Sequence, residues 1–268
     1  KKEPPVEYLK TSEYFGNQIL KVPSCLTRVV VRKQVDLPRK LTIELNELEG
    51  RVLFINKAIT LRDRQRTSKK LIYKYQTLPQ ALEAYINLAE NTPLSRENPY
   101  RLIPDASAVK PNQRLARTNG EASQKFWYML PPLVKRHIPD FCIARVNHEL
   151  PQVYMLHNQG VVVDANFCTL WLDEQSQQYK FAYFALLNSN WFKACLECIC
   201  TVMGGGALKV EATQLKKVPL PILSGNDYRV LQENGELLSK FNSQAEIDNL
   251  RKQIDAVILR RIFNDQVA

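Results

Sequence analysis

Three consecutive glycines followed by lysines are the first feature of this chain that suggests chemistry. The glycines are Gly204, Gly205 and Gly206, and the lysines after them are Lys209, Lys216 and Lys217. A turn without side chains can adopt positive φ or approach another surface closely, and its exposed N–H groups can meet a phosphate. The same pattern is typical of a helix end followed by a flexible turn. Both interpretations stay open on the residues alone.

A dense basic segment lies earlier in the chain. Between Arg28 and Lys74 there are thirteen basic residues against five acidic ones. Its tightest part contains Arg62, Arg64, Arg66, Lys69 and Lys70. Such residues can follow a phosphate backbone, and arginine can pair with guanine in a groove, although a run of this kind can also be a solvated loop. We predict nucleic-acid contacts from these five, and further contacts from Lys135, Arg136 and the residues of the glycine–lysine stretch.

The sequence contains no complete catalytic constellation. None of the three histidines stands in a recognisable nucleophile motif, and Pro139-Asp140 with Glu149 lacks the lysine that a metal-dependent nuclease would need. Cys195, Cys198 and Cys200 raise a metal hypothesis, but no second ligand pair follows them, and buried thiols are the alternative. We therefore predict no catalytic residue and no metal site in this chain.

Composition is that of a folded protein with an anionic partner. The 268 residues are 45% hydrophobic and 24% charged, and the formal net charge is +10 with a pI near 9.3. Nucleic acid is the commonest large anionic partner. No apolar run approaches the roughly 20 residues of a membrane span. Scattered cysteines and the lack of an apolar leader in the first ten residues favour a reducing cytoplasm over secretion.

The elements that would carry these residues are mixed. β-branched runs predict strands at 26–33 and 50–62, and apolar spacing predicts a helix over 77–91. A polar connection follows, then strands and turns from 125 to 173, with one bend at 157–160. Two helices broken near Asn188 and an amphipathic helix over 245–263 complete the chain. We expect Trp127, Trp171 and Trp191 to be core residues rather than stacking platforms.

This pattern predicts an α+β fold in three parts. They are a basic N-terminal segment at 1–91, a connection at 92–124, and a β-rich domain with a helical insert and a closing helix at 125–268.

The order of motifs from Lys125 to Phe263 resembles the target-recognition domain of adenine-specific DNA methyltransferases from restriction–modification systems, the Taq-like group with its type IIG and type I relatives. "KFWYMLPP" is similar to the family's first, aromatic-rich strand, and "HNQGVVVDANFCTLW" to its strand–turn–strand. "LKKVPLPIL" is similar to its short closing strand, and "EIDNLRKQIDAVILRRIF" to its final helix. "VPSCLTRVVVRK" is similar to the last strand of the family's catalytic domain.

The family's catalytic motifs are not in this sequence. The resemblance implies methyl transfer from S-adenosylmethionine to a flipped adenine, held by an Asn/Asp-Pro-Pro-Tyr/Phe tetrapeptide. Asn98-Pro99-Tyr100 lacks the second proline, and Phe15-Gly16-Asn17 is too little for a cofactor loop. The resemblance therefore implies that a catalytic domain or subunit outside this chain binds S-adenosylmethionine, while this chain selects the site on double-stranded DNA.

Two alternatives remain from the residues. A basic, non-enzymatic module that binds RNA or a protein would show the same charge, with the closing helix serving oligomerisation. A complete enzyme of an unrecognised class is the third. Sequence preference on duplex DNA would distinguish site recognition from the basic binding module. Cofactor uptake by the isolated chain would favour the unrecognised enzyme.

Overall fold

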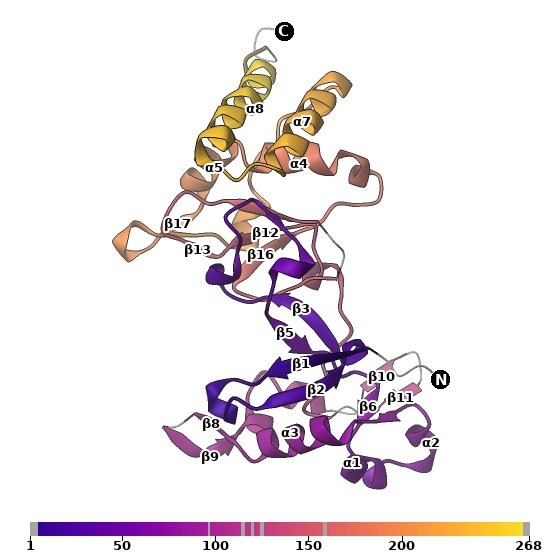
Figure 1. Cartoon of the computed structure of the whole chain (residues 1–268). Coiled ribbons are helices and arrows are strands. Elements are labelled where there is room, and N and C mark those ends of the chain that lie inside the picture. Colours follow the sequence, from indigo (N-terminus) through magenta and orange to yellow (C-terminus); the bar gives the residue numbers. More distant parts are fainter. Residues whose placement is uncertain are drawn as a thin grey trace. The chain divides into compact units, whose positions relative to one another are not determined.

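The computed structural model describes residues 5–95, 97–113, 116–118, 121–123, 126–157 and 160–264. It divides into two compact units. Unit 1 consists of Lys1–Arg28 and Arg51–Pro132, and unit 2 of Val29–Gly50 and Leu133–Ala268. The chain thus leaves unit 1 at residue 29, contributes residues 29–50 to unit 2, and returns to unit 1 at residue 51. The three consecutive parts predicted from the sequence, 1–91, 92–124 and 125–268, do not include this crossing. Helices and mixed sheets occur together, so the fold class is α+β, as predicted (Figure 1).

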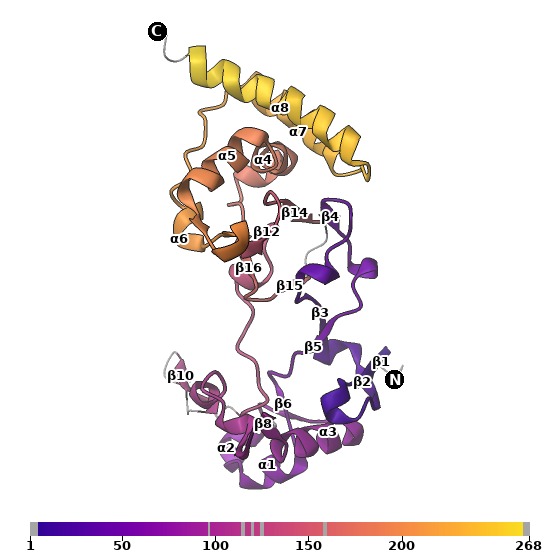
Figure 2. The same cartoon turned by 90° about the vertical axis from the view of Figure 1, so that its left-hand side faces the viewer.

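Unit 1 combines short strand pairs with three helices, which lie together on one side of it (Figures 1 and 2). The antiparallel pairs are β1 (Val6–Lys10) with β2 (Ile19–Pro23), β8 (Pro93–Ser95) with β9 (Asn98–Leu102), and β10 (Ala116–Thr118) with β11 (Glu121–Ser123). β6 (Ala58–Ile59) pairs in parallel with β7 (Gln76–Thr77), and β5 (Arg51–Leu53) precedes them. The helices are α1 (Leu61–Arg66), α2 (Lys69–Ile72) and α3 (Gln80–Glu90).

The core of unit 1 forms where α3 covers strand residues. Leu82, Ile86 and Ala89 are buried on α3, at the helical spacing read from the sequence. Leu82 and Ile86 join Val22 of β2 and Ile59 of β6 in one apolar cluster. The helix predicted over 77–91 is therefore confirmed, with its first residue at Gln80.

Unit 2 is built around a four-stranded sheet in the order β16 (Phe167–Leu170), β12 (Phe141–Ala144), β14 (Val153–Leu156) and β4 (Thr42–Ile43). β12 runs antiparallel to both neighbours, whereas β14 and β4 are parallel. A second sheet has the order β13 (Val146–Asn147), β18 (Leu208–Lys209) and β17 (Thr201–Val202). β15 (Val162–Val163) pairs in parallel with β3 (Thr27–Val31), which begins at the boundary of the units.

Both faces of β12 are covered, so it reads as a continuous apolar run. Phe141 and Ile143 belong to the cluster beneath the helices, and Cys142 and Ala144 to a second cluster on the opposite face. This alternation is the two-residue period of a strand. β16 stands at the edge of the sheet. One of its sides is therefore free of strand partners within the described residues.

Helices cover one face of this sheet. They are α4 (Lys180–Leu187), α5 (Asn190–Ile199), α6 (Ala212–Leu215), α7 (Gly225–Leu238) and α8 (Gln244–Asn264). The break between α4 and α5 falls where the sequence predicted it, because Ser189 caps α5 by accepting a hydrogen bond from Phe192 N–H. α7 and α8 lie next to each other at the C-terminal end of the chain (Figures 1 and 2). The closing helix is confirmed.

α4 and α7 cross very closely, and a glycine makes this possible. A Cβ built on Gly235 of α7 would lie 2.0 Å from the carbonyl oxygen of Phe181 in α4. No side chain fits at that separation, so Gly235 is required by the crossing rather than by a turn.

Two predicted strands are wrong, and one helix was missed. Residues 126–132 contain a turn and no strand, and 215–223 contain the last residue of α6, a turn and irregular chain. Both segments carry two prolines, which lack the N–H that a strand ladder needs. α7 was not predicted, although Ser224 and Asp227 form a capping box at its start. Lys125, Asn158 and Gln159 lie outside the described residues.

Candidate nucleic-acid interface

The positive excess of the chain lies entirely in unit 1. Over the sequence, unit 1 has 19 lysines and arginines against 9 acidic residues, whereas unit 2 has 18 of each. Long-range attraction of a polyanion therefore comes from unit 1. The sequence had indicated a basic segment from Arg28 to Lys74. The structure divides this segment, because residues 29–50 belong to unit 2, which has no net charge.

The predicted basic segment forms α1 and α2, and two of its arginines bind within the protein. Arg62 Nη2 forms an ion pair with Glu90 Oε2 at 2.6 Å, and the interaction with Glu90 raises the pKa of Arg62 above its usual value. Arg64 Nη1 donates to the carbonyl oxygen of Tyr75 at 3.0 Å. The two side chains connect α1 to Glu90 of α3 and to the backbone of Tyr75. They are therefore less available to a ligand than the sequence suggested.

The other three basic residues of the segment point outward. Arg66, Lys69 and Lys70 are exposed, and within the described part of the chain none of them forms an ion pair. Tyr73 follows one turn after Lys70 and is 89% exposed. Cations beside an exposed aromatic ring are the combination that nucleic-acid surfaces use, because the cations meet phosphates while the ring stacks. We call Arg66, Lys69, Lys70 and Tyr73 the cationic cluster of unit 1.

A buried hydrogen-bond network positions α1. Asp63 is 6% exposed, and its Oδ2 accepts from Tyr128 Oη at 2.7 Å and from Thr60 Oγ1 at 2.8 Å. Thr60 also caps the helix by accepting from Asp63 N–H at 3.0 Å. Burial, with the bond to Asp63, raises the pKa of Tyr128 far above its ordinary value. The tyrosine therefore stays a donor, and the helix start is held from a residue 65 positions away.

The glycine triplet is the tip of a hairpin, which projects from unit 2 in Figure 1. β17 and β18 pair antiparallel, with Val202 opposite Leu208, and the glycines form the turn. Gly205 and Gly206 have φ of 80° and 81°, and the space around both is open. The triplet thus supplies positive φ, one of the two uses considered from the sequence. Gly206 N–H donates to the carbonyl oxygen of Met203 at 3.1 Å, so the exposed N–H groups that remain at the tip are those of Gly204 and Gly205.

The remaining predicted cations are distributed over unit 2. Lys209 is paired with Glu211 at 2.7 Å, while Lys135 and Lys217 are exposed. Arg136 and Lys216 meet at one recess, a groove of about 590 Å³ beside the edge strand β16. Arg145 and Trp171 line it too; sequence reasoning assigned no role to Arg145, and it placed Trp171 in the core. We call this recess the β16 groove.

Trp171 corrects an expectation. It is 47% exposed, whereas Trp127 and Trp191 are half-buried against apolar clusters as expected. Trp171 directly follows β16, so the sheet no longer covers it. The sequence signal was weak: an aromatic residue just after an apolar strand, next to the polar run 173–178.

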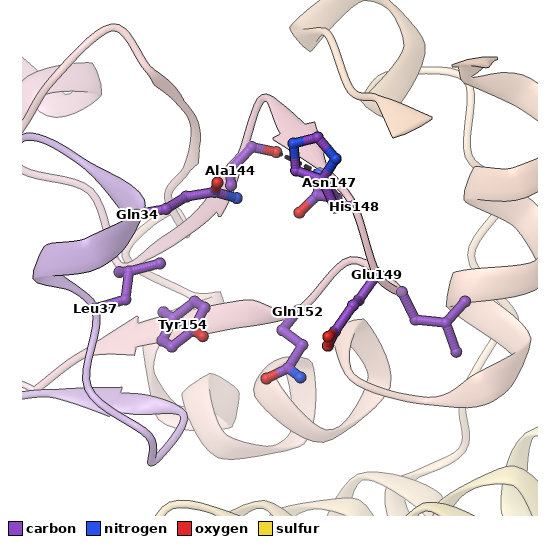
Figure 3. Close-up of a pocket in the computed structure, with 9 residues that line it drawn as sticks. Gln34, Leu37, Ala144, Asn147, His148, Glu149, Gln152 and Tyr154 are labelled. Atoms are coloured by element: carbon purple, nitrogen blue, oxygen red, sulfur yellow. Dashed lines mark hydrogen bonds between the residues drawn. The ribbon is translucent and has the colours of Figure 1, made fainter. Parts of the chain in front are cut away.

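A second recess in unit 2 is lined by amides (Figure 3). It measures about 260 Å³, and its lining includes Gln34, Gln152, Tyr154, His148 and Glu149, whose side chains Figure 3 shows. Gln34 Nε2 donates to the carbonyl oxygen of Val146 at 2.7 Å, which leaves its Oε1 for other partners. The recess joins residues more than a hundred positions apart. Its polar groups are the kind that read base edges.

The short motifs weighed for catalysis have structural explanations. Gly16 and Asn17 take φ of 77° and 53° in the β1–β2 hairpin turn. Asn98-Pro99-Tyr100 begins β9, and Tyr100 is 94% exposed. The six cysteines are free thiols, with Cys198 exposed and Cys200 buried. Among the residues that the structure describes, no group of three His, Cys, Asp or Glu side chains is placed to hold a metal.

No protein-family model matches the chain, and no curated protein matches it in sequence. Over the described residues, no helix has both the length and the apolar character that a membrane crossing requires.

Proposed function

We propose that this chain recognises a site on double-stranded DNA for an adenine-N6 methyltransferase of the restriction–modification kind. The observation that carries the proposal is the cationic cluster of unit 1, together with the confinement of the net charge of +10 to that unit. Lysine and arginine that lack acidic partners release counterions when they meet phosphates, which is the main source of affinity for duplex DNA.

Base reading belongs to unit 2 in this proposal. Gln34 and Gln152 offer the amide pair of acceptor and donor that can bind adenine through its N6 and N7 atoms. The recess brings them together from two separate segments, next to β12 and β14, and the hydrogen bond to the Val146 carbonyl oxygen orients Gln34. The backbone N–H groups of Gly204 and Gly205 at the hairpin tip would add phosphate contacts.

Methyl transfer is assigned to a catalytic domain or subunit outside this chain, with S-adenosylmethionine as its cofactor. The support is the resemblance of residues 125–263 to a target-recognition domain, and the structural use of Gly16 and of Asn98–Tyr100 in hairpins. The isolated chain should therefore transfer no methyl group from labelled S-adenosylmethionine to duplex DNA. Transfer or saturable uptake of the cofactor would identify a different enzyme class.

The proposal is tested by selection from randomised duplex DNA with the purified chain at about 0.15 M salt. We expect one enriched motif that includes an adenine. Gln152→Ala should relax the preference at one position by about 1–3 kcal/mol and leave binding to unrelated duplexes unchanged. Gln178→Ala, an exposed glutamine outside the recess, is the matched control.

Selection without enrichment would contradict site recognition. Tighter binding to structured RNA than to any duplex, at the same salt, would favour the basic RNA-binding module instead. Because both interpretations predict salt-dependent binding, the salt dependence alone does not separate them.

A further inference from the structure

The β16 groove brings together charges that the sequence keeps far apart. Arg136 comes from a 3₁₀ turn at Lys135–His137, Arg145 follows β12, and Lys216 follows α6. All three are exposed and line the same recess, although unit 2 as a whole has as many acidic as basic residues. A local excess of cations in a neutral unit requires an explanation of its own.

Among the residues that the structure describes, no carboxylate lines the groove. Arg145 interacts electrostatically with Glu211, whose pKa is lowered mainly by its hydrogen bond to Lys209 and, more weakly, by Arg145. Glu211 lies 2.7 Å from Lys209, so its charge is already balanced. The three cations therefore face a recess that is electrostatically suited to an anion.

The groove also has an aromatic and apolar side. Trp171 is 47% exposed at its rim, and Leu170 and Leu215 line it from β16 and α6. Cys168 is not a reactive group there, because burial raises the pKa of its thiol and its Sγ donates to the carbonyl oxygen of Val210 at 3.3 Å. A volume of about 590 Å³ lies within the range of about 300–1,000 Å³ typical of small-molecule sites.

We infer that the β16 groove binds a nucleoside 5′-phosphate, with the base stacked on Trp171 and the phosphate held by Arg136, Arg145 and Lys216. A nucleotide has a planar base, which can stack on the aromatic side of the groove, and a phosphate linked to it through the ribose, which can meet the cations. A peptide strand is the other ligand that an edge strand accepts. Three cations without a carboxylate among the lining residues favour the phosphate.

The same chemistry can come from a free nucleotide or from one unpaired nucleotide of a strand. Neither source depends on the duplex recognition proposed above, since the cationic cluster belongs to the other unit. Arg66→Gln/Lys69→Gln/Lys70→Gln should therefore weaken duplex binding and leave mononucleotide binding unchanged. Failure of one proposal is in this way distinguishable from failure of the other.

The test is calorimetric titration of the full chain with adenosine 5′-monophosphate, adenosine, inorganic phosphate and a short single-stranded oligonucleotide. We expect the monophosphate to bind at least tenfold more tightly than adenosine or phosphate alone. An oligonucleotide that binds more than tenfold more tightly than the monophosphate identifies a strand as the source, and equal binding identifies a free nucleotide.

Two variants separate the two sides of the groove. Trp171→Ala should weaken the monophosphate about tenfold and leave phosphate unchanged, whereas Arg145→Gln should weaken both. Lys217→Gln is the control, because Lys217 is an exposed neighbour of Lys216 that does not line the groove.

Three results would overturn the inference. They are phosphate binding as tightly as the monophosphate with no effect of Trp171→Ala, no saturable binding of the monophosphate up to millimolar concentration, and tighter binding of an extended peptide than of the monophosphate. Circular dichroism of each variant establishes that it is folded.

Discussion

Two buried cations lie in the helical layer of unit 2. Lys193 of α5 and Arg251 of α8 are each 3% exposed. Arg251 donates to the carbonyl oxygen of Asn188 at 3.1 Å and to Asp248 at 2.9 Å, but its Nη2 is buried without a partner. Burial, and then the charge of Arg251, lowers the pKa of Lys193 to about 8. A charge held this way opposes folding at neutral pH.

The sign of the pH dependence follows from this shift. The unfolded state binds the Lys193 proton up to about pH 10.5, whereas the folded state releases it near pH 8. Between these values the unfolded state holds more protons, so the free energy of unfolding rises with pH, by about 3 kcal/mol in total.

Lys193→Met is expected to raise the free energy of unfolding at pH 7 by about 1–3 kcal/mol, because it removes the buried charge. It should also remove the rise between pH 8 and 10.5. Urea unfolding at pH 7 and pH 10 measures both effects, with the exposed Lys240→Met as the control. Equal pH dependence of variant and wild type would contradict the assignment.

At the scale of elements, the α4–α7 crossing depends on one position. The backbone of Phe181 occupies the place of a side chain at Gly235, and the crossing positions the layer that covers the sheet. The β16 groove is itself a product of element placement, since its walls are an edge strand, a 3₁₀ turn and α6.

Gly235→Ala is expected to destabilise unit 2 by about 1–3 kcal/mol or more, because the added methyl group overlaps the Phe181 carbonyl and forces the helices apart. Gly225→Ala is a matched control at the start of the same helix, where a Cβ meets nothing within 4 Å. It should be neutral or stabilise by up to about 1 kcal/mol. Chemical unfolding of the two variants compares them directly, and equal midpoints would show that the crossing adjusts freely.

At the scale of the whole molecule, charge is divided by unit. The excess of +10 in unit 1 predicts that non-specific attraction to nucleic acid comes from there, whereas the neutral unit 2 supplies recesses with local chemistry. Affinity and selectivity can then be changed separately by mutation.

Neutralising Arg66, Lys69 and Lys70 to glutamine is expected to weaken binding to all duplexes alike. It should also flatten the slope of log affinity against log salt by about 1 for each residue that meets a phosphate. Fluorescence anisotropy with labelled duplexes over a salt series measures this slope. Lys240→Gln/Lys252→Gln removes exposed charges of unit 2 and should leave the slope unchanged. An unaltered slope in the triple variant would exclude the cluster from the interface.

Local patterns of the sequence determined the elements whose signals are contained in a few residues. The helices α3, α5 and α8 and the strand β3 formed where spacing, caps and β-branched runs placed them. The α+β class followed from their order. Prolines interrupt the segments 126–132 and 215–223, and the strands predicted there did not form. Aromatic and apolar character suggested the first strand, and the family resemblance suggested the second.

Only the tertiary structure decided which of the predicted basic residues are available to a ligand. Arg62 and Arg64 look equivalent to Arg66 in sequence, but Glu90 and the Tyr75 carbonyl bind them, and such partners depend on how α1 packs against later elements. Arg136, Arg145, Trp171 and Lys216 share no local pattern, and only the sheet edge and α6 bring them to one groove. Periodicity reports which side of an element is apolar, whereas proximity between distant segments arises from burial and close packing of the whole unit.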